Sequence, residues 1–223
     1  MPRINNDKFY KSALKKHGAT AKGLNWHDDY SQQKRFEVIY EVIKDDIQTG
    51  DTIVDAGCGF GDFYTFLSDI PLSYSSQAGA WELDYIGYEI VEENVKIARE
   101  RTGQRIIQKD ILKGSLEVAD FYIASGSMNI LSRFETFLFI ERCFDHSKKG
   151  FVFNLLYGKD ESRSFNYFLP QEIKHFAKKF TSSTSSSQAG AWELDVLVKS
   201  GYLPHDFTIY LKKSIPKSLK NQN

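Results

Sequence analysis

The chain has 223 residues, and its 29 basic side chains balance 29 acidic ones, so the formal net charge at pH 7 is zero. This length suits one α/β domain with a sizeable core, and the neutral balance implies no global electrostatic steering toward nucleic acid. Two cysteines make neither a disulfide framework nor a metal cluster. No signal peptide and no membrane-spanning apolar run is visible, so we expect a cytoplasmic protein with no metal site and no membrane partner.

Residues 1–50 are predicted to form a helical N-terminal extension that covers the ligand site. A short first helix is expected to run through Lys16. Ser31 is expected to cap a second helix, which has apolar residues at helical spacing and ends at Gly50. Because this helix leads directly into the first strand, its start must lie at the carboxyl edge of the strands, where open α/β sheets bind ligands.

The most informative stretch is 52–62, in which an apolar run leads into Asp55 and three glycines then alternate: Gly57, Gly59 and Gly61. Glycines allow a tight turn and a close approach of a ligand to the backbone, and the following helix would aim its first N–H groups at that ligand. The G-x-G-x-G spacing differs from the G-x-G-x-x-G of dinucleotide sites. A carboxylate at Asp55 would repel a pyrophosphate but suits a cationic ligand.

Strand and helix patterns alternate after this turn, which argues for a parallel sheet with helices on both faces. Two further strands, separated by a turn at 202–206, would add an antiparallel closing strand. We therefore predict a Rossmann-like, doubly wound, mostly parallel seven-stranded sheet over 51–212, followed by a disordered basic tail at 213–223. The predicted strands after the glycine turn are 85–90, 105–109, 119–124, 150–156, 196–199 and 207–212.

The decapeptide SSQAGAWELD occurs twice, at 75–84 and at 186–195, between neighbours that share no similarity. This predicts two insertions of one peptide into exposed loops, away from the core and the ligand site. Without the first copy, the 28 positions from Gly61 to Glu89 become 18. Nucleotide-binding folds separate the glycine turn from a ribose-binding acid by about 20 positions. The alternative is that 80–83 lengthens the following strand, since apolar residues alternate there.

Acidic residues stand at the ends of three successive predicted strands, at Asp55, Glu89 and Asp110. With the glycine turn, they resemble the class I S-adenosylmethionine-dependent methyltransferase family. The resemblance implies S-adenosylmethionine as the cofactor, with Glu89 accepting the ribose hydroxyls and Asp110 the adenine amino group. The candidate cofactor-binding residues are Asp55, Gly57, Cys58, Gly59, Gly61, Glu89, Ile90, Asp110, Ile111, Ser125 and Arg35.

The flanks of this region, 23–36 and 202–210, resemble a group of small bacterial methyltransferases without a settled substrate. The resemblance therefore implies a fold and a cofactor but no acceptor. Arg35 lies in the first flank, and we expect it to pair with the carboxylate of the cofactor through two parallel hydrogen bonds.

Methyl transfer mainly requires that nucleophile and methyl group be held in line and that water be excluded, so a missing catalytic triad does not argue against activity. No residue is assigned as catalytic, and the candidate acid–base residues are His27, Asp28, Tyr30, Asn129 and His205. The fourth strand is followed by Ser-Gly-Ser-Met-Asn rather than by Asn/Asp-Pro-Pro-Tyr/Phe. This difference argues against the amino-methyltransferases of adenine or glutamine.

We expect methyl transfer to a small-molecule acceptor, with a protein or an RNA acceptor left open. Two other classes stay open at this point: a non-catalytic S-adenosylmethionine-binding module and a nicotinamide-dependent oxidoreductase. The glycine spacing and Asp55 speak against the second.

Overall fold

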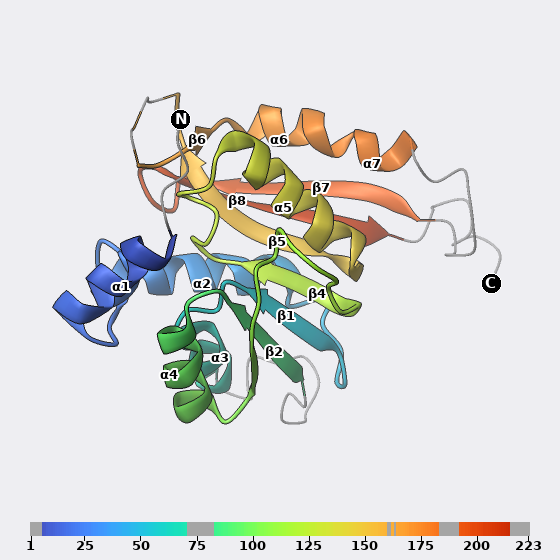
Figure 1. Cartoon of the computed structure of the whole chain (residues 1–223). Helices are drawn as coiled ribbons and strands as arrows, with labels where there is room; N and C mark the ends of the chain where they lie inside the picture. Colours follow the sequence, from blue (N-terminus) through green and yellow to red (C-terminus); the bar gives the residue numbers. More distant parts are fainter. Residues whose placement is uncertain (1–5, 71–82, 160–161, 163, 183–191, 215–223) are drawn as a thin grey trace.

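The computed structural model describes residues 6–70, 83–159, 162, 164–182 and 192–214 (Figure 1). The chain alternates helices and strands over most of this length. The elements are α1 (Asn6–His17), the 3-10 helix η1 (Ala21–Leu24), α2 (Asp29–Ile43), β1 (Thr52–Ala56), α3 (Asp62–Ser68), β2 (Asp84–Glu89), α4 (Glu92–Thr102), β3 (Arg105–Gln108), β4 (Ala119–Ala124), α5 (Arg133–Asp145), β5 (Ser147–Tyr157), β6 (Tyr167–Phe168), α6 (Pro170–Ala177), α7 (Lys179–Ser182), β7 (Glu193–Ser200) and β8 (Asp206–Ser214).

The strands form one sheet in the order β3-β2-β1-β4-β5-β8-β7, and β6 pairs with β5 beside this path. β1 to β5 run parallel, whereas β8 lies antiparallel between β5 and β7. This confirms the predicted Rossmann-like, doubly wound sheet with an antiparallel closing strand. β6 was not predicted, because a strand of two residues carries no alternation pattern.

Helices cover both faces of the sheet, with α2, α3 and α4 on one face and α5, α6 and α7 on the other (Figure 1). Adjacent residues of β1 supply both layers, because successive strand side chains point to opposite faces. Ile53 packs with Ile39 of α2, and Val54 packs in the cluster that contains Ile140 of α5. All four side chains are fully buried. Burial on both faces explains why the first strand reads as an apolar run rather than as an alternating one.

The second helix starts and ends earlier than predicted. Asp28 rather than Ser31 caps α2, and its Oδ1 accepts a hydrogen bond from the Ser31 backbone N–H at 2.7 Å. Asp28 has the extended backbone of an N-cap residue, whereas Ser31 already lies inside the helix. The helix ends at Ile43, and a turn follows it before Gly50. The helix still runs antiparallel to β1, so its start lies at the ligand edge as expected.

The described ends of the repeated decapeptide belong to the sheet. β2 begins at Asp84, the last residue of the first copy, and β7 begins at Glu193 inside the second. The Trp192 ring is partly buried and packs edge-on against an aromatic ring of α5, with the centroids 5.6 Å apart. The prediction of wholly exposed loops is therefore wrong for these ends, because Trp-Glu-Leu-Asp alternates apolar and polar residues with the period of a strand. Residues 75–82 and 186–191 lie outside the described residues.

β8 extends to Ser214, so the first two residues of the predicted disordered tail belong to the sheet. Residues 215–223 lie outside the described residues. In the described part of the chain, no helix has both the length and the apolar character needed to cross a bilayer.

Candidate functional site

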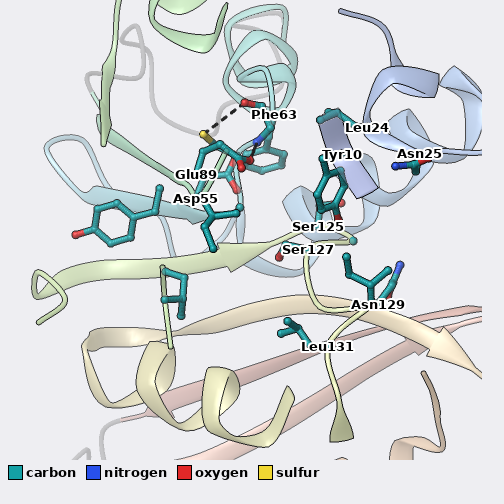
Figure 2. A pocket seen from close by; sticks show the side chains of 18 of the residues that line it. Tyr10, Leu24, Asn25, Asp55, Phe63, Glu89, Ser125, Ser127, Asn129 and Leu131 are labelled. Atoms are coloured by element: carbon teal, nitrogen blue, oxygen red, sulfur yellow. Dashed lines mark hydrogen bonds between the residues drawn. The ribbon is translucent and has the colours of Figure 1, made fainter. Parts of the chain in front are cut away.

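A pocket runs along the carboxyl ends of β1 to β4, under α1 and η1 (Figure 2). This is the edge at which open α/β sheets bind their ligands. The cofactor-binding candidates from the sequence line the pocket, except for two described residues, Gly61 and Arg35. Those in the lining are Asp55, Gly57, Cys58, Gly59, Glu89, Ile90, Asp110, Ile111 and Ser125.

The glycine turn at the end of β1 leaves no room for side chains. Gly57 has a φ of +93°, and a Cβ built on it would lie 2.3 Å from Cβ of Ser127. Gly59 has a φ of +57°, and its Cβ would lie 2.6 Å from a methyl group of Leu24. Only glycine combines these left-handed backbone angles with such close neighbours. The turn therefore presses its backbone against the end of β4 and against η1.

Replacing Gly57 with alanine is expected to lower the free energy of unfolding by at least about 1 kcal/mol, the cost of left-handed backbone for a residue with a Cβ. Urea unfolding measures this change. Gly114→Ala is the matched control, because Gly114 also has a positive φ, +67°, but no atom lies within 4 Å of a built Cβ. The contact with Ser127 predicts the larger loss for Gly57→Ala, and equal losses would show that the contact has no effect.

Glu89 ends β2 and lies against the glycine turn. One carboxylate oxygen accepts from the Gly59 backbone N–H at 3.1 Å, and the other accepts from the Val91 N–H at 2.8 Å. A carboxylate has about four acceptor positions, so both oxygens can still accept from a ligand. Burial raises the pKa of Glu89 to about 7, although these backbone hydrogen bonds oppose the rise.

Asp55 ends the first strand beneath the turn. Its Oδ2 accepts a hydrogen bond from the Tyr85 hydroxyl at 2.7 Å, and its side chain is buried. Burial raises the pKa of Asp55 to about 7, and the nearby Glu89 adds to the rise. Two buried acids thus line one pocket, and a positively charged ligand would favour the ionised form of both.

Asp110 and Ile111 follow β3 at the far end of the pocket. Asp110 Oδ1 accepts from the Leu112 backbone N–H at 3.0 Å, and Oδ2 lies 3.2 Å from the Lys113 ammonium group. The carboxylate therefore stabilises the turn that follows β3. Ile111 is buried in the pocket wall and contributes an apolar side chain to it.

The segment after β4 is held in place by Asn154 of β5. The Asn154 Oδ1 accepts from the Gly126 backbone N–H at 2.9 Å, and its Nδ2 donates to the Ser125 hydroxyl at 3.2 Å. The Ser127 hydroxyl donates to the Ala56 carbonyl at 2.8 Å. Sequence reasoning missed Asn154, although a polar residue inside an otherwise apolar strand is the signal that marks it.

Arg35 has a partner other than the one expected. Its guanidinium makes three hydrogen bonds of 2.7–3.0 Å to the carboxylate of Asp206, and both side chains are buried. It also lies 4.5 Å from the centroid of the Trp26 ring. The expected pairing with a cofactor carboxylate is thereby corrected, because Asp206 at the start of β8 already fills the fork of the guanidinium. Arg35 instead fixes Trp26, which lines the pocket.

Of the five candidate acid–base residues, the structure places only Asn129 in the described pocket lining. The His27 side chain is 90% exposed and pairs with Asp28, which caps α2. Tyr30 and His205 are also exposed. The turn that carries His205 lies at the carboxyl edge of the parallel strands, because β8 pairs antiparallel with β5 and begins beside the end of that strand.

Sequence reasoning missed many of the pocket residues, among them Phe9 and Tyr10 of α1, Gln32 of α2, and Phe165 before β6. Figure 2 shows Tyr10 reaching toward the end of β4, where Ser125 lies. Burial raises the pKa of the Tyr10 hydroxyl, with a further contribution from Glu89. From the sequence, Phe9 and Tyr10 could be recognised as apolar residues of the first helix, but not as residues that line the pocket.

Among the described residues, no group of three or more His, Cys, Asp or Glu side chains is placed to hold a metal ion. Cys58 and Cys143 are free thiols, and burial raises the pKa of both.

The strand order, the glycine turn and the buried acids at the ends of β1 and β2 match the Rossmann-like fold of the class I S-adenosylmethionine-dependent methyltransferases, as predicted. Solved structures of other proteins support this assignment of the fold. The chain is similar to magnesium protoporphyrin IX methyltransferase from Synechocystis with bound S-adenosylmethionine, at 15% identity over 96% of this chain and 86% of that one, with a TM-score of 0.57. No protein-family model and no curated protein matches the chain.

Two further structures show the same likeness. A TehB-like methyltransferase from Corynebacterium glutamicum is 14% identical over 94% of this chain and all of that one, with a TM-score of 0.60. The 1,6-didemethyltoxoflavin-N1-methyltransferase from Burkholderia thailandensis, solved with its substrate and S-adenosylhomocysteine, is 11% identical over 96% of this chain and 93% of that one, with a TM-score of 0.60. These identities establish the fold, and one fold can serve many functions.

Proposed function

We propose that the protein is an S-adenosylmethionine-dependent methyltransferase that acts on a small molecule. The observation that carries the proposal is the pair of buried acids, Asp55 and Glu89, on either side of a glycine turn in one pocket. A sulfonium and an ammonium group on one ligand would compensate the charge of these acids. The three structural relatives described above are named as methyltransferases, which supports the same reading.

In this proposal, Glu89 accepts from the ribose hydroxyls and the Gly57–Gly61 turn borders the methionine part of the cofactor. Asp110 accepts from the adenine amino group, and Ile111 packs against the ring. The chain's own residues then bind and orient the reactants and exclude water, so that nucleophile and methyl group are held in line. No general base is assigned.

Calorimetric titration with S-adenosylmethionine, S-adenosylhomocysteine and NAD tests the cofactor. We expect binding of the first two and none of NAD. Binding of NAD alone would favour an oxidoreductase. Binding of S-adenosylmethionine without methylation of any fraction of a cell extract, followed with a radiolabelled methyl group, would favour a non-catalytic module.

A small-molecule acceptor is favoured because the residues after β4 and those of α1 border one shared pocket. Two relatives act on small molecules according to their names, a porphyrin and a toxoflavin precursor, whereas another is a small RNA methyltransferase. RNA as the methylated fraction of the extract would contradict our choice. The two free, buried thiols fit a reducing compartment such as the cytoplasm.

Affinity for S-adenosylmethionine is expected to rise with pH between 6 and 8. The pKa values of Asp55 and Glu89 are raised to about 7, so a cationic ligand must first displace protons at lower pH. The stability of the ligand-free protein is expected to change with pH in the opposite direction. A carboxyl group whose pKa is raised on folding stabilises the folded protein at acidic pH, and this contribution is lost as the pH rises from about 4 to 7.

Calorimetry at pH 6, 7 and 8, in buffers of different ionisation enthalpy, measures both the affinity and the protons released. Thermal unfolding of the free protein over pH 5 to 8 gives the second trend. An affinity that is flat over this interval, with no proton release, would contradict the assigned role of the two acids.

A further inference from the structure

The charges in the pocket are confined to one half of it. The described charged lining residues are Asp55, Asp62, Glu89, Lys109 and Asp110, and each lies at the carboxyl end of β1, β2 or β3 or soon after it. Around the end of β4, the described lining is aromatic, aliphatic or neutral and polar. The proposed function places the cofactor in the charged half, so the neutral half is left for the acceptor. A charged acceptor would have to give up hydration there without a counter-charge.

Aromatic rings from three separate segments enclose the neutral half. Phe9 of α1 and Phe165 before β6 pack edge to face, with their centroids 6.5 Å apart. The Arg35 guanidinium stacks on the Trp26 ring. The ring also lies against Gly126, where a side chain would not fit, because a Cβ on Gly126 would lie 2.6 Å from the indole. Rings fixed in this way offer flat apolar surfaces, which suit a planar aromatic ligand.

Neutral polar side chains accompany these rings, and three of those described are bound within the protein. Asn25 donates to the main chain of α1, Ser125 accepts from a side chain of β5, and Ser127 donates to the main chain of β1. Asn129 differs, because its Oδ1 is buried and has no hydrogen-bond partner among the described residues. Figure 2 shows Asn129 on the segment that leaves β4, bordering the pocket. A buried unpaired acceptor is unfavourable unless a ligand donates to it.

We infer that the acceptor is an uncharged, planar heteroaromatic small molecule whose ring N–H donates a hydrogen bond to Oδ1 of Asn129. The identification of this ligand as the methyl acceptor rests on the proposed function. The hydrogen bond serves recognition and positioning, and it is separate from the atom that receives the methyl group. A site with a buried polar group discriminates strongly against ligands that leave the group unpaired. Asn129 is therefore the residue that determines specificity in this half.

A pair of simple probes tests this inference. Indole and benzofuran have the same shape, but only indole carries a ring N–H. We expect ligand-observed NMR titrations to show that indole binds about 5- to 10-fold more tightly than benzofuran, because the net free energy of one ordinary hydrogen bond corresponds to an affinity ratio of about this size. Asn129→Ala should abolish the difference, whereas Asn129→Asp keeps the acceptor oxygen and should preserve it. Gln171→Ala is the control, since it removes an exposed carboxamide from α6 and should change neither affinity.

Equal affinities, no binding of either probe, or a preference that survives in Asn129→Ala would each overturn the inference. Tighter binding of indole-3-carboxylate than of indole would overturn the claim of a neutral acceptor. The titrations are run on the protein alone and with saturating S-adenosylhomocysteine. Failure of S-adenosylhomocysteine to bind would overturn the proposed function, and the probe comparison on the protein alone would still decide the inference.

Discussion

Replacing Glu89 with alanine is expected to weaken the binding of S-adenosylmethionine by about 10- to 150-fold, which corresponds to about 1.5–3 kcal/mol for hydrogen bonds to a charged group. In the proposal, this carboxylate accepts from the ribose hydroxyls while it also holds the Gly59 backbone N–H at 3.1 Å. The substitution removes both interactions, so the ligand loses its acceptor and the glycine turn loses a support. Calorimetric titration of both proteins with S-adenosylmethionine measures the ratio of affinities.

Glu89→Gln separates the two roles. Glutamine keeps the size of the side chain but only one of the two oxygens that accept from the Gly59 and Val91 backbone N–H groups, so we expect an affinity and a melting temperature between those of Glu89→Ala and wild type. The pKa of Glu89 is raised to about 7, and part of the wild-type population is protonated at neutral pH. The gap between wild type and Glu89→Gln should therefore widen at pH 8. An affinity of Glu89→Ala equal to wild type would remove Glu89 from the cofactor site.

Replacing Arg35 with methionine is expected to lower the free energy of unfolding by about 3–5 kcal/mol, because it leaves a buried carboxylate without its partner. The side chains of Arg35 and Asp206 are only 9% and 5% exposed. For a chain of this length such a loss corresponds to a fall in melting temperature of about 6–20 °C. Urea unfolding and thermal melts both measure it.

The double variant Arg35→Met/Asp206→Leu is the informative control. Replacing a whole buried ion pair with apolar residues of similar volume is often neutral. We therefore expect it to recover most of the stability that the single variant loses. The affinity of the double variant for S-adenosylhomocysteine distinguishes two roles for Arg35. If Arg35 holds Trp26 and does not bind the cofactor, this affinity should stay within a few-fold of wild type. A large loss of that affinity in a well-folded double variant would restore the original expectation for Arg35.

Local patterns were sufficient to predict the main strands of the sheet and the charged half of the pocket. The apolar strand, the three glycines and the acids at strand ends are each read from a few neighbouring residues, and parallel strands bring such ends to one edge. Asp55, Glu89 and Asp110 lie along one pocket for this reason. The start of α2 was misplaced by three residues because Asp28 and Ser31 are both good capping residues.

Contacts between distant segments were out of reach of the same reasoning. Nothing near Arg35 indicates that Asp206 is its partner, so a cofactor carboxylate was an equally good match for the guanidinium. Phe9 and Phe165 meet across the pocket although 156 positions separate them. The end of the second decapeptide was assigned to a loop because its exact repetition outweighed the strand-like alternation around Trp192.

The Arg35–Asp206 pair also limits when the protein can complete its fold. The two residues are 171 positions apart, and Asp206 lies at the start of the last strand of the sheet. A ribosome adds about 5–20 residues per second, so roughly 10–30 seconds separate the synthesis of the two partners. During that interval Arg35 has emerged without its counter-charge, and Trp26 lacks the support that fixes it in the pocket wall. The nascent chain can therefore form its first strands early, but it finishes the pocket only after translation has reached the closing hairpin.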